Sequence, residues 1–362
     1  MTYSVFNTDG EDKGRRMFLG TPVNIARYDQ SKWPFLLKLA RQAEGYYWQP
    51  ENTTLAKDAQ DFKKLQPEEE HIFTSNLKRQ ILLDSVQGRA LSAAFGPITT
   101  LPELEGWWKV QEYWERIHNR SYTYLLQNVY SNPSKVFDGI LDIQEIADCA
   151  KDISAEYDKL IMLNNLHAVG TTIFIKDEYK RQIWRTMHAL NALEGIRFYV
   201  SFICSWAFAE QGKMEGNAKI IKLIARDENI HLGFSQQMIK NLPKDDEDFV
   251  QIAKEDAPYI QKMVQNVVDQ EKTWAKYLFT HGAMLGLNEE ILCTSVDHFA
   301  WKRAKAIGIQ GFKEVKNPLP WIDKWIAGSD IQEAPQETEK SAYIMGGINQ
   351  NVSEDAFEGF EL

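Results

Sequence analysis

Residues 221–235 read IKLIARDENIHLGFS and set a carboxylate and an imidazole into an apolar helical pattern. At spacings of three and four residues, one face of this helix carries Ile221, Ile224, Glu228, His231 and Ser235. Glutamate and histidine three residues apart can place an oxygen and a nitrogen on one metal ion. The stretch therefore predicts a helix that carries metal-binding side chains on a buried face.

A second Glu-x-x-His pair, Glu115 to His118, lies in the predicted helix 102–130. Its face also carries Trp108, Gln111, Tyr122 and Leu125. A third match, Glu68 to His71, follows Pro67 among further charges and is interpreted as a solvated helix start. One such pair alone is more often a satisfied surface pair. Two copies on separate apolar faces favour a metal site.

Two other predicted helices each place one carboxylate in apolar surroundings. Asp84 shares its face with Leu77 and Leu91, and Glu194 shares its face with Met187 and Phe198. Burying four ionised carboxylates without compensation costs too much free energy. Two divalent cations would bring +4 against the −4 of the carboxylates, and neutral imidazoles complete the ligand set. The candidate ligands are Asp84, Glu115, His118, Glu194, Glu228 and His231. Such oxygen and nitrogen donors suit iron or manganese better than structural zinc.

The hydrophobic periodicity predicts an all-α fold. The predicted helices are 33–47, 67–94, 102–130, 142–168, 176–210, 215–240, 246–282 and 288–307. Breaks are expected at residues 131–134 and 241–244, and residues 170–175 are expected to form a strand-like connector. Long helices joined by short connections favour a ferritin-like bundle, with a dinuclear site in a four-helix core and additional flanking helices.

Composition excludes several classes of protein. The 362 residues carry a net charge of −10, so no basic surface for nucleic acid is expected. Cys149, Cys204 and Cys293 are too scattered for a disulfide framework or a thiolate zinc site. No signal peptide and no apolar stretch long enough to cross a membrane are apparent. We therefore expect a cytoplasmic protein.

Four stretches resemble the small, radical-generating subunit of class I ribonucleotide reductase, and the resemblance covers essentially the whole chain. They are residues 76–85, 115–123, 193–202 and 224–232. The resemblance implies a homodimer that binds a large subunit and activates dioxygen at a diiron centre. A dimanganese centre and a flavoprotein or ferredoxin activator are also consistent with it. It assigns Asp84, Glu115 and His118 to one metal ion, and Glu194, Glu228 and His231 to the other.

The same resemblance gives roles to residues around the ligands. Tyr122 corresponds to the tyrosine that stores the radical, although the residues alone favour a core aromatic side chain. Trp48, Asp227, Glu337 and Tyr343 correspond to the radical-transfer route to the large subunit. The pocket that shields the radical corresponds to Phe198, Phe202 and Ile224.

Composition changes near the end of the chain and predicts two parts. Residues 1–329 are expected to form the helical domain, with 1–32 as an extended arm. Residues 330–362 are polar and acidic, and are expected to form a flexible tail that docks to the large subunit. The docking side chains would be Phe357, Phe360 and Leu362, unless the terminus is simply frayed.

The leading function is the small subunit of ribonucleoside-diphosphate reductase. The alternative is a dinuclear oxygenase or oxidase with its own organic substrate, since the same ligands serve many chemistries. Iron storage would require a shorter, cage-forming bundle.

Two residues depart from the family pattern: Trp114 stands where a small residue is expected, and Gln111 where an aromatic one is expected. Sequence alone decides neither the metal, the substrate level (we favour diphosphate), nor a cellular or viral origin.

Overall fold

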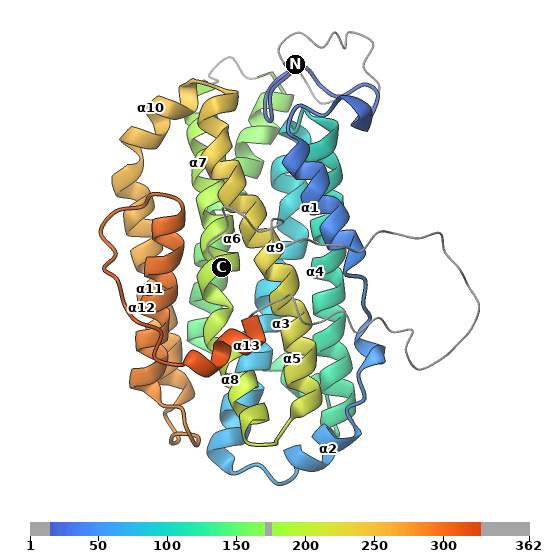
Figure 1. Cartoon of the computed structure of the whole chain (residues 1–362), viewed down its shortest axis with the longest axis vertical. Helices are drawn as coiled ribbons and strands as arrows, with labels where there is room; N and C mark the ends of the chain where they lie inside the picture. Colours follow the sequence, from blue (N-terminus) through green and yellow to red (C-terminus); the bar gives the residue numbers. More distant parts are fainter. Residues whose placement is uncertain (1–14, 171–175, 327–362) are drawn as a thin grey trace, which may run out of the picture.

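The computed structural model describes residues 15–170 and 176–326, and these are mostly helical (Figure 1). The helices are α1 (Pro34–Gly45), α2 (Ala56–Phe62), α3 (Pro67–Phe95), α4 (Pro102–Val129), α5 (Ser134–Asp138), α6 (Gln144–Ala168), α7 (Lys176–Ala192), α8 (Tyr199–Glu210), α9 (Glu215–Asp245), α10 (Asp248–Glu255), α11 (Ala257–Leu278), α12 (Glu289–Ala306) and α13 (Asp323–Ile326). Within the described residues, β-structure amounts to isolated bridges, Phe18 with Thr99 and Met284 with Leu287. The all-α prediction is confirmed.

The N-terminus of α3 shows how local sequence sets a helix start. Pro67 occupies the first helical position, where its missing N–H is not needed. Gln66 precedes it, and the Gln66 backbone N–H donates to the Glu69 carboxylate at 3.2 Å in a capping box. The predicted start of this helix is therefore confirmed.

The long helices run side by side in a bundle (Figure 1). α3 packs on α4 and α8, and α9 packs on α4, α7 and α8, so these helices enclose the centre of the bundle. α11 and α12 pair along one flank, and α1 lies against α4 and α9. Buried apolar side chains form one continuous core between the helices. A bundle with flanking helices, as predicted, is confirmed.

Residues 176–210 do not form the single α-helix that the periodicity predicts. α7 ends at Ala192, a π-helical segment follows over Leu193–Arg197, and α8 begins at Tyr199. A π-helical segment inserts an extra residue into the turn, and such segments are frequent at functional sites. Glu194, one of the predicted ligands, lies within it.

The break predicted at residues 241–244 is wrong, because α9 continues through Pro243 to Asp245. Pro243 lies in the last turn of α9, so its missing N–H removes one helical hydrogen bond and few residues of the helix follow it. That turn is held from outside, since Asp245 accepts hydrogen bonds from Lys32 Nζ at 2.6 Å and Trp33 Nε1 at 2.9 Å.

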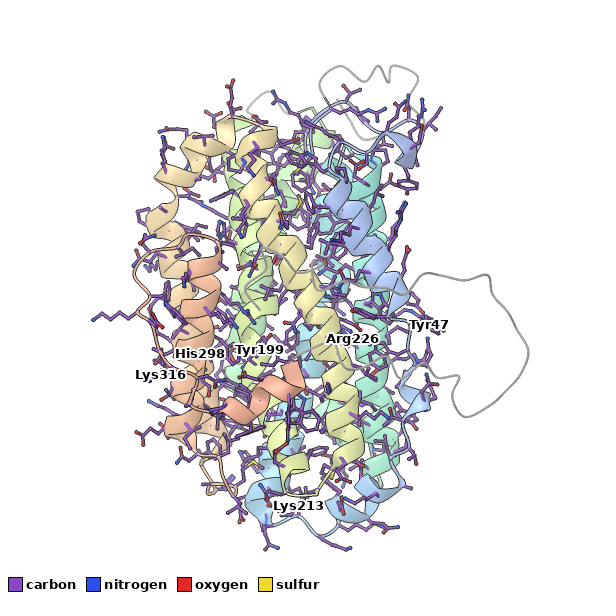
Figure 2. The ribbon with its side chains drawn as sticks, viewed as in Figure 1. Tyr47, Tyr199, Lys213, Arg226, His298 and Lys316 are labelled. Carbon is purple, nitrogen blue, oxygen red and sulfur yellow. The ribbon has the colours of Figure 1, made fainter. Side chains whose placement is uncertain are left out.

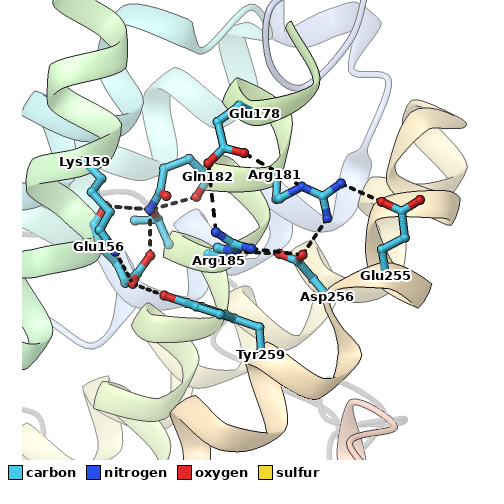
Figure 3. A network of polar contacts seen from close by, with 10 residues as sticks. Glu156, Lys159, Glu178, Arg181, Gln182, Arg185, Glu255, Asp256 and Tyr259 are labelled. Atoms are coloured by element: carbon cyan, nitrogen blue, oxygen red, sulfur yellow. Dashed lines mark hydrogen bonds and ion pairs between the residues drawn. The ribbon is translucent and has the colours of Figure 1, made fainter. Parts of the chain in front are cut away.

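The predicted helix 246–282 is divided into α10 and α11 at Asp256. Pro258 lies two residues later and suits the first turn of a new helix. Asp256 accepts hydrogen bonds from two arginines of α7, Arg181 Nη1 at 2.5 Å and Arg185 Nε at 2.6 Å. Figure 3 shows these ion pairs between α7 and the α10–α11 junction.

The same polar network reaches α6 through Glu156 (Figure 3). The Glu156 carboxylate accepts hydrogen bonds from Tyr259 Oη at 2.6 Å and Gln182 Nε2 at 2.7 Å. Side chains of α6, α7 and α11 are thereby joined, and the flanking helices are held to the bundle.

Several predictions fall on residues 1–14, 171–175 and 327–362, which lie outside the described residues. They include most of the strand-like connector, part of the N-terminal arm and the whole acidic tail. Gly170, the first residue of the predicted connector, has a φ of 67°, which favours glycine. No helix in the described part of the chain is both long and apolar enough to span a membrane.

Candidate metal centre

The predicted ligands meet in the middle of the bundle. α3 supplies Asp84, α4 supplies Glu115 and His118, the π-helical segment supplies Glu194, and α9 supplies Glu228 and His231. Each of these side chains is at most 1% exposed. Residues separated by more than 100 positions in the sequence thus form one buried cluster.

The ligand atoms fall into two groups, within each of which they lie no more than 4.8 Å apart. One group contains Asp84 and His118, the other contains Glu194 and His231, and Glu115 and Glu228 belong to both. His118 Nδ1 lies 3.0 Å from Glu228 Oε1, and His231 Nδ1 lies 3.3 Å from Glu115 Oε1. Glu115 and Glu228 therefore lie between two candidate ion positions. The assignment of three ligands to each ion, made from the sequence, does not include this sharing.

Unsatisfied oxygens show that this cluster suits cations. Both carboxylate oxygens of Asp84 and Oε2 of Glu194 are buried and accept no hydrogen bond from the described residues. Leaving a buried charged acceptor unsatisfied is costly. Two divalent ions among these oxygen and nitrogen donors would satisfy the acceptors and balance the charges. The residues present therefore fit a dinuclear iron or manganese centre.

The electrostatics of the bare cluster point the same way. Burial, reinforced by the Glu115 and Glu228 carboxylates, raises the pKa of Asp84 well above its usual range. Burial likewise raises the pKa of Glu194, again with Glu228 and Glu115 contributing. Burial disfavours the imidazolium of His231, but the Glu228 and Glu115 carboxylates together outweigh burial, and the pKa of His231 rises to about 9. Protons thus take the place of cations when no metal is bound.

A close helix contact supports the π-helical segment that carries Glu194. A Cβ on Gly195 would lie 3.0 Å from Leu232 and 3.1 Å from Arg303. Arg303, from α12, donates from Nη2 to the Tyr199 hydroxyl at 2.9 Å. Glycine at this position therefore lets α9 and α12 pack closely against the segment.

Trp48 and Asp227, singled out in the sequence, lie next to the ligand His118. Trp48 Nε1 donates to Asp227 Oδ2 at 2.7 Å, and His118 Nε2 lies 3.3 Å from the same oxygen. The Trp48 and His118 rings are stacked with centroids 6.3 Å apart. A carboxylate on the outer nitrogen fixes the orientation of a metal-binding imidazole and leaves Nδ1 facing the cluster.

Gln87 escaped the sequence analysis. Its Nε2 donates to Glu194 Oε1 at 2.8 Å, and its Oε1 accepts from the Tyr157 hydroxyl at 2.9 Å. Gln111 Nε2 donates to the same Glu194 oxygen at 3.0 Å, and Gln111 Oε1 accepts from Trp107 Nε1 at 3.1 Å. The signal that could have identified Gln87 is its position three residues after Asp84, as an amide on a largely apolar face.

Tyr122 is fully buried on α4, one turn beyond His118. Burial, followed by the Asp84 and Glu228 charges, raises the pKa of its phenol well above the usual range. Phe198, Phe202 and Ile224 are also fully buried, and the two phenylalanine rings stack with centroids 5.5 Å apart. The phenol thus stays protonated in surroundings that exclude water.

The remaining predicted site residues lie outside the described part of the chain: Glu337, Tyr343, Phe357, Phe360 and Leu362.

Comparisons with known proteins agree on one family. Residues 27–318 match the family described as ribonucleotide reductase, small chain. The chain is 45% identical to ribonucleoside-diphosphate reductase subunit beta of Buchnera aphidicola, over the full length of both chains. It is 42% identical to ribonucleoside-diphosphate reductase 1 subunit beta of Escherichia coli O157:H7, also over both full lengths. Among solved structures, the ribonucleotide reductase R2 subunit from Clostridium botulinum superposes with a TM-score of 0.80 at 27% identity, covering 90% of this chain and 98% of that one.

Proposed function

The chain belongs to the ribonucleotide reductase small-chain family, and from this premise we propose that Tyr122 stores a radical beside the buried carboxylate cluster. The chain is the beta subunit of a ribonucleoside-diphosphate reductase. A beta subunit works with an alpha subunit. We assign the reduction of ribonucleotides to the alpha subunit and the supply of the oxidising equivalent to this chain.

The position of Tyr122 carries the proposal. Its ring is fully buried, and it follows the ligand His118 by one helical turn. A phenoxyl radical persists only where water and reductants are excluded, and we assign this shielding to Phe198, Phe202 and Ile224, which are also fully buried.

We assign the bound ions to iron, with manganese as the other candidate. When bound, two such ions would supply electrons to dioxygen at the cluster. Asp84, His118, Glu194 and His231 would hold one ion or the other, and Glu115 and Glu228 would contact both. A manganese-loaded protein would call for a flavoprotein or ferredoxin as activator.

Trp48 and Asp227 begin the proposed route from the cluster toward the alpha subunit. The Asp227 carboxylate keeps both the Trp48 indole and the His118 imidazole in place. We extend this route through Tyr343 and Glu337 in residues 330–362, and we assign docking to Phe357, Phe360 and Leu362. Deleting residues 330–362 should abolish turnover with the alpha subunit and leave the radical signal unchanged. Undiminished turnover of the truncated chain would refute docking through this segment.

We further propose that the chain forms a homodimer. Met162 and Val169 lie seven residues apart on α6 and its C-cap, and they are 55% and 74% exposed. Large exposed apolar side chains on one helix face suit a protein contact. Met162→Glu should shift the mass measured by analytical ultracentrifugation toward that of one chain, whereas an unchanged mass would count against this face.

Electron paramagnetic resonance tests the proposed function directly. Metal-free protein is loaded with ferrous iron without oxygen and then exposed to air. We expect a tyrosyl signal that is absent in Tyr122→Phe, while iron content remains that of the wild type. Full iron uptake without a radical, even after manganese loading with a flavoprotein activator, would favour an oxygenase with its own substrate.

A further inference from the structure

A row of aromatic rings leads from the candidate metal centre to the protein surface. Trp114 stacks on Trp48, with ring centroids 6.4 Å apart and planes inclined by 12°. On its other sides it meets Tyr47 at 6.4 Å and Tyr113 at 5.3 Å. Each step lies within the range of direct aromatic contact.

Burial changes along this row from inside to outside. Trp48 and Trp114 are 4% and 2% exposed, whereas Tyr113 and Tyr47 are 37% and 57% exposed. Figure 2 shows Tyr47 at the outer edge of the molecule, beside α4. The buried indoles therefore connect the His118 ring with two phenols that solvent can reach.

The proposed function requires one electron from a donor outside the protein. Reducing dioxygen to the level of water takes four electrons. Two metal ions, when bound, would supply one electron each, and Tyr122 would supply the third. The fourth must cross the protein from a donor at the surface, and indole and phenol rings are the side chains best suited to carry it.

We propose that Trp114 links Trp48 to Tyr47 and Tyr113 in an electron-transfer route, by which a one-electron reductant at the surface serves the metal centre. This inference rests on the proposed function. In the step itself, a donor at the Tyr47–Tyr113 surface loses one electron, and a Trp48 ring oxidised during the oxygen reaction regains it. No covalent bond forms or breaks, and the Trp48 N–H remains on Asp227, so the step requires no net proton transfer.

The rim of this surface favours donors with negative charge. Arg116 is exposed and places its guanidinium 5.8 Å from the centre of the Tyr113 ring. In a chain of net charge −10, a local cation at the end of the route attracts an anionic donor. We therefore identify the donor class as an anionic one-electron reductant, such as a reduced flavin, and we choose ferrocyanide as the probe.

The test follows oxidation of ferrocyanide during the oxygen reaction. Ferrous-loaded full-length protein is mixed rapidly with oxygen and ferrocyanide. Stopped-flow absorbance records ferricyanide, and freeze-quenched samples record the tyrosyl signal. Trp114→Phe keeps an aromatic ring but removes the indole, and it should slow ferricyanide formation by about ten-fold or more. Trp108→Phe is the matched control, because Trp108 lies on the same helix, is also 2% exposed, and stacks on Phe95 instead.

Two further variants separate electron transfer from packing. Trp114→Tyr restores a ring that can be oxidised and should recover part of the rate that Trp114→Phe loses. If Trp114→Phe does not fold, the double variant Tyr47→Phe, Tyr113→Phe tests the same route at its exposed end and should also slow ferricyanide formation. Metal content and thermal unfolding are measured for each variant.

The outcomes distinguish this inference from the proposed function. Ferricyanide formation at the wild-type rate in well-folded Trp114→Phe overturns the route, even when the tyrosyl radical forms normally. Absence of ferricyanide in the wild type overturns it as well. Ferricyanide that depends on Trp114, without any tyrosyl signal, supports the route and contradicts radical storage at Tyr122.

Discussion

Trp48 and His118 meet on a single oxygen, Oδ2 of Asp227, at 2.7 Å from the indole nitrogen and 3.3 Å from the imidazole nitrogen. Because that one oxygen serves both rings, the orientation of a metal ligand and the position of the first aromatic ring outside the cluster are set together. Arg226 adds weaker contacts at 3.4 Å to the other oxygen of the same carboxylate. The pair thus behaves as one structural unit.

Asp227→Asn should weaken metal binding while the fold persists. The amide keeps the shape of the carboxylate but removes its charge, and partners of this kind typically change metal affinity by about 10- to 100-fold. Titration with manganese(II), followed by its magnetic resonance signal, measures the affinity. Asp61→Asn serves as control, since Asp61 accepts the Met214 backbone N–H far from the cluster. Equal affinities for the two variants would contradict the assignment.

Substituting a ligand that belongs to both groups should remove more metal than substituting a ligand that belongs to only one. Asp84 occurs only in the group with His118, whereas Glu228 occurs in both groups. Asp84→Asn should therefore lose mainly one ion, and Glu228→Gln should lose most of both. Elemental analysis after gel filtration gives the ion content for each chain. Asp58→Asn, at a buried carboxylate that binds the Gly216 N–H at 3.0 Å, should retain the wild-type content.

Gln111→Leu should lower the metal affinity of the ligand group that contains Glu194. The variant removes one of two amide donors from Glu194 Oε1, while Gln87 keeps its contact at 2.8 Å. We expect a loss of about ten-fold in affinity for one ion, at the lower end for such partners. Calorimetric titration resolves the two binding events. Gln182→Leu, a buried amide that binds Glu156 instead, should leave both events as they are.

His188 should make the metal-free protein sensitive to mild acid. Burial lowers its pKa from 6.5 to about 3, and neither ring nitrogen has a hydrogen-bond partner among the described residues. The unfolded chain therefore binds a proton below pH 6.5 that the folded chain does not. The contribution of His188 to the free energy of unfolding is therefore complete above pH 6.5. As the pH falls from 6.5 toward 3, this free energy decreases by about 1.4 kcal/mol per pH unit.

Urea unfolding of His188→Phe at pH 7 and pH 5 measures this effect. The phenyl ring retains the contact with Trp184, whose ring centre lies 4.7 Å away from that of His188. The variant should lose less stability between the two pH values than the wild type does. Equal losses would show that other groups cause the acid sensitivity.

Much of the fold follows from local sequence. Pro67, Pro102 and the apolar periodicity set helix starts and faces, so most helices begin within two residues of the expected position. The break at Asp256 does not follow from local sequence, because the Asp256 carboxylate is held by arginines that lie about 70 residues earlier in the chain. Pro243 misled the prediction for the complementary reason, since distant partners of Asp245 keep the helix intact.

The ligands were predictable because a buried carboxylate on an apolar helix face requires an explanation. The sharing of Glu115 and Glu228 between both groups was not predictable, because it depends on how the helices are rotated against one another. Gln87 was missed for a related reason. An amide on a helix face is common, and only the packing of α6 beside α3 gives it Tyr157 as a partner.

The π-helical segment has a consequence for how this chain tolerates insertions and deletions. The π-helical turn holds one residue more than an α-helical turn, so deleting one residue from Leu193–Arg197 would close the bulge and leave the direction in which α8 faces largely unchanged. The backbone that carries Glu194 would nevertheless move, although no ligand had been substituted. A deletion within α8 itself would instead rotate the residues that follow it by about 100°, and because α8 is buried on all sides, each of them would meet new neighbours.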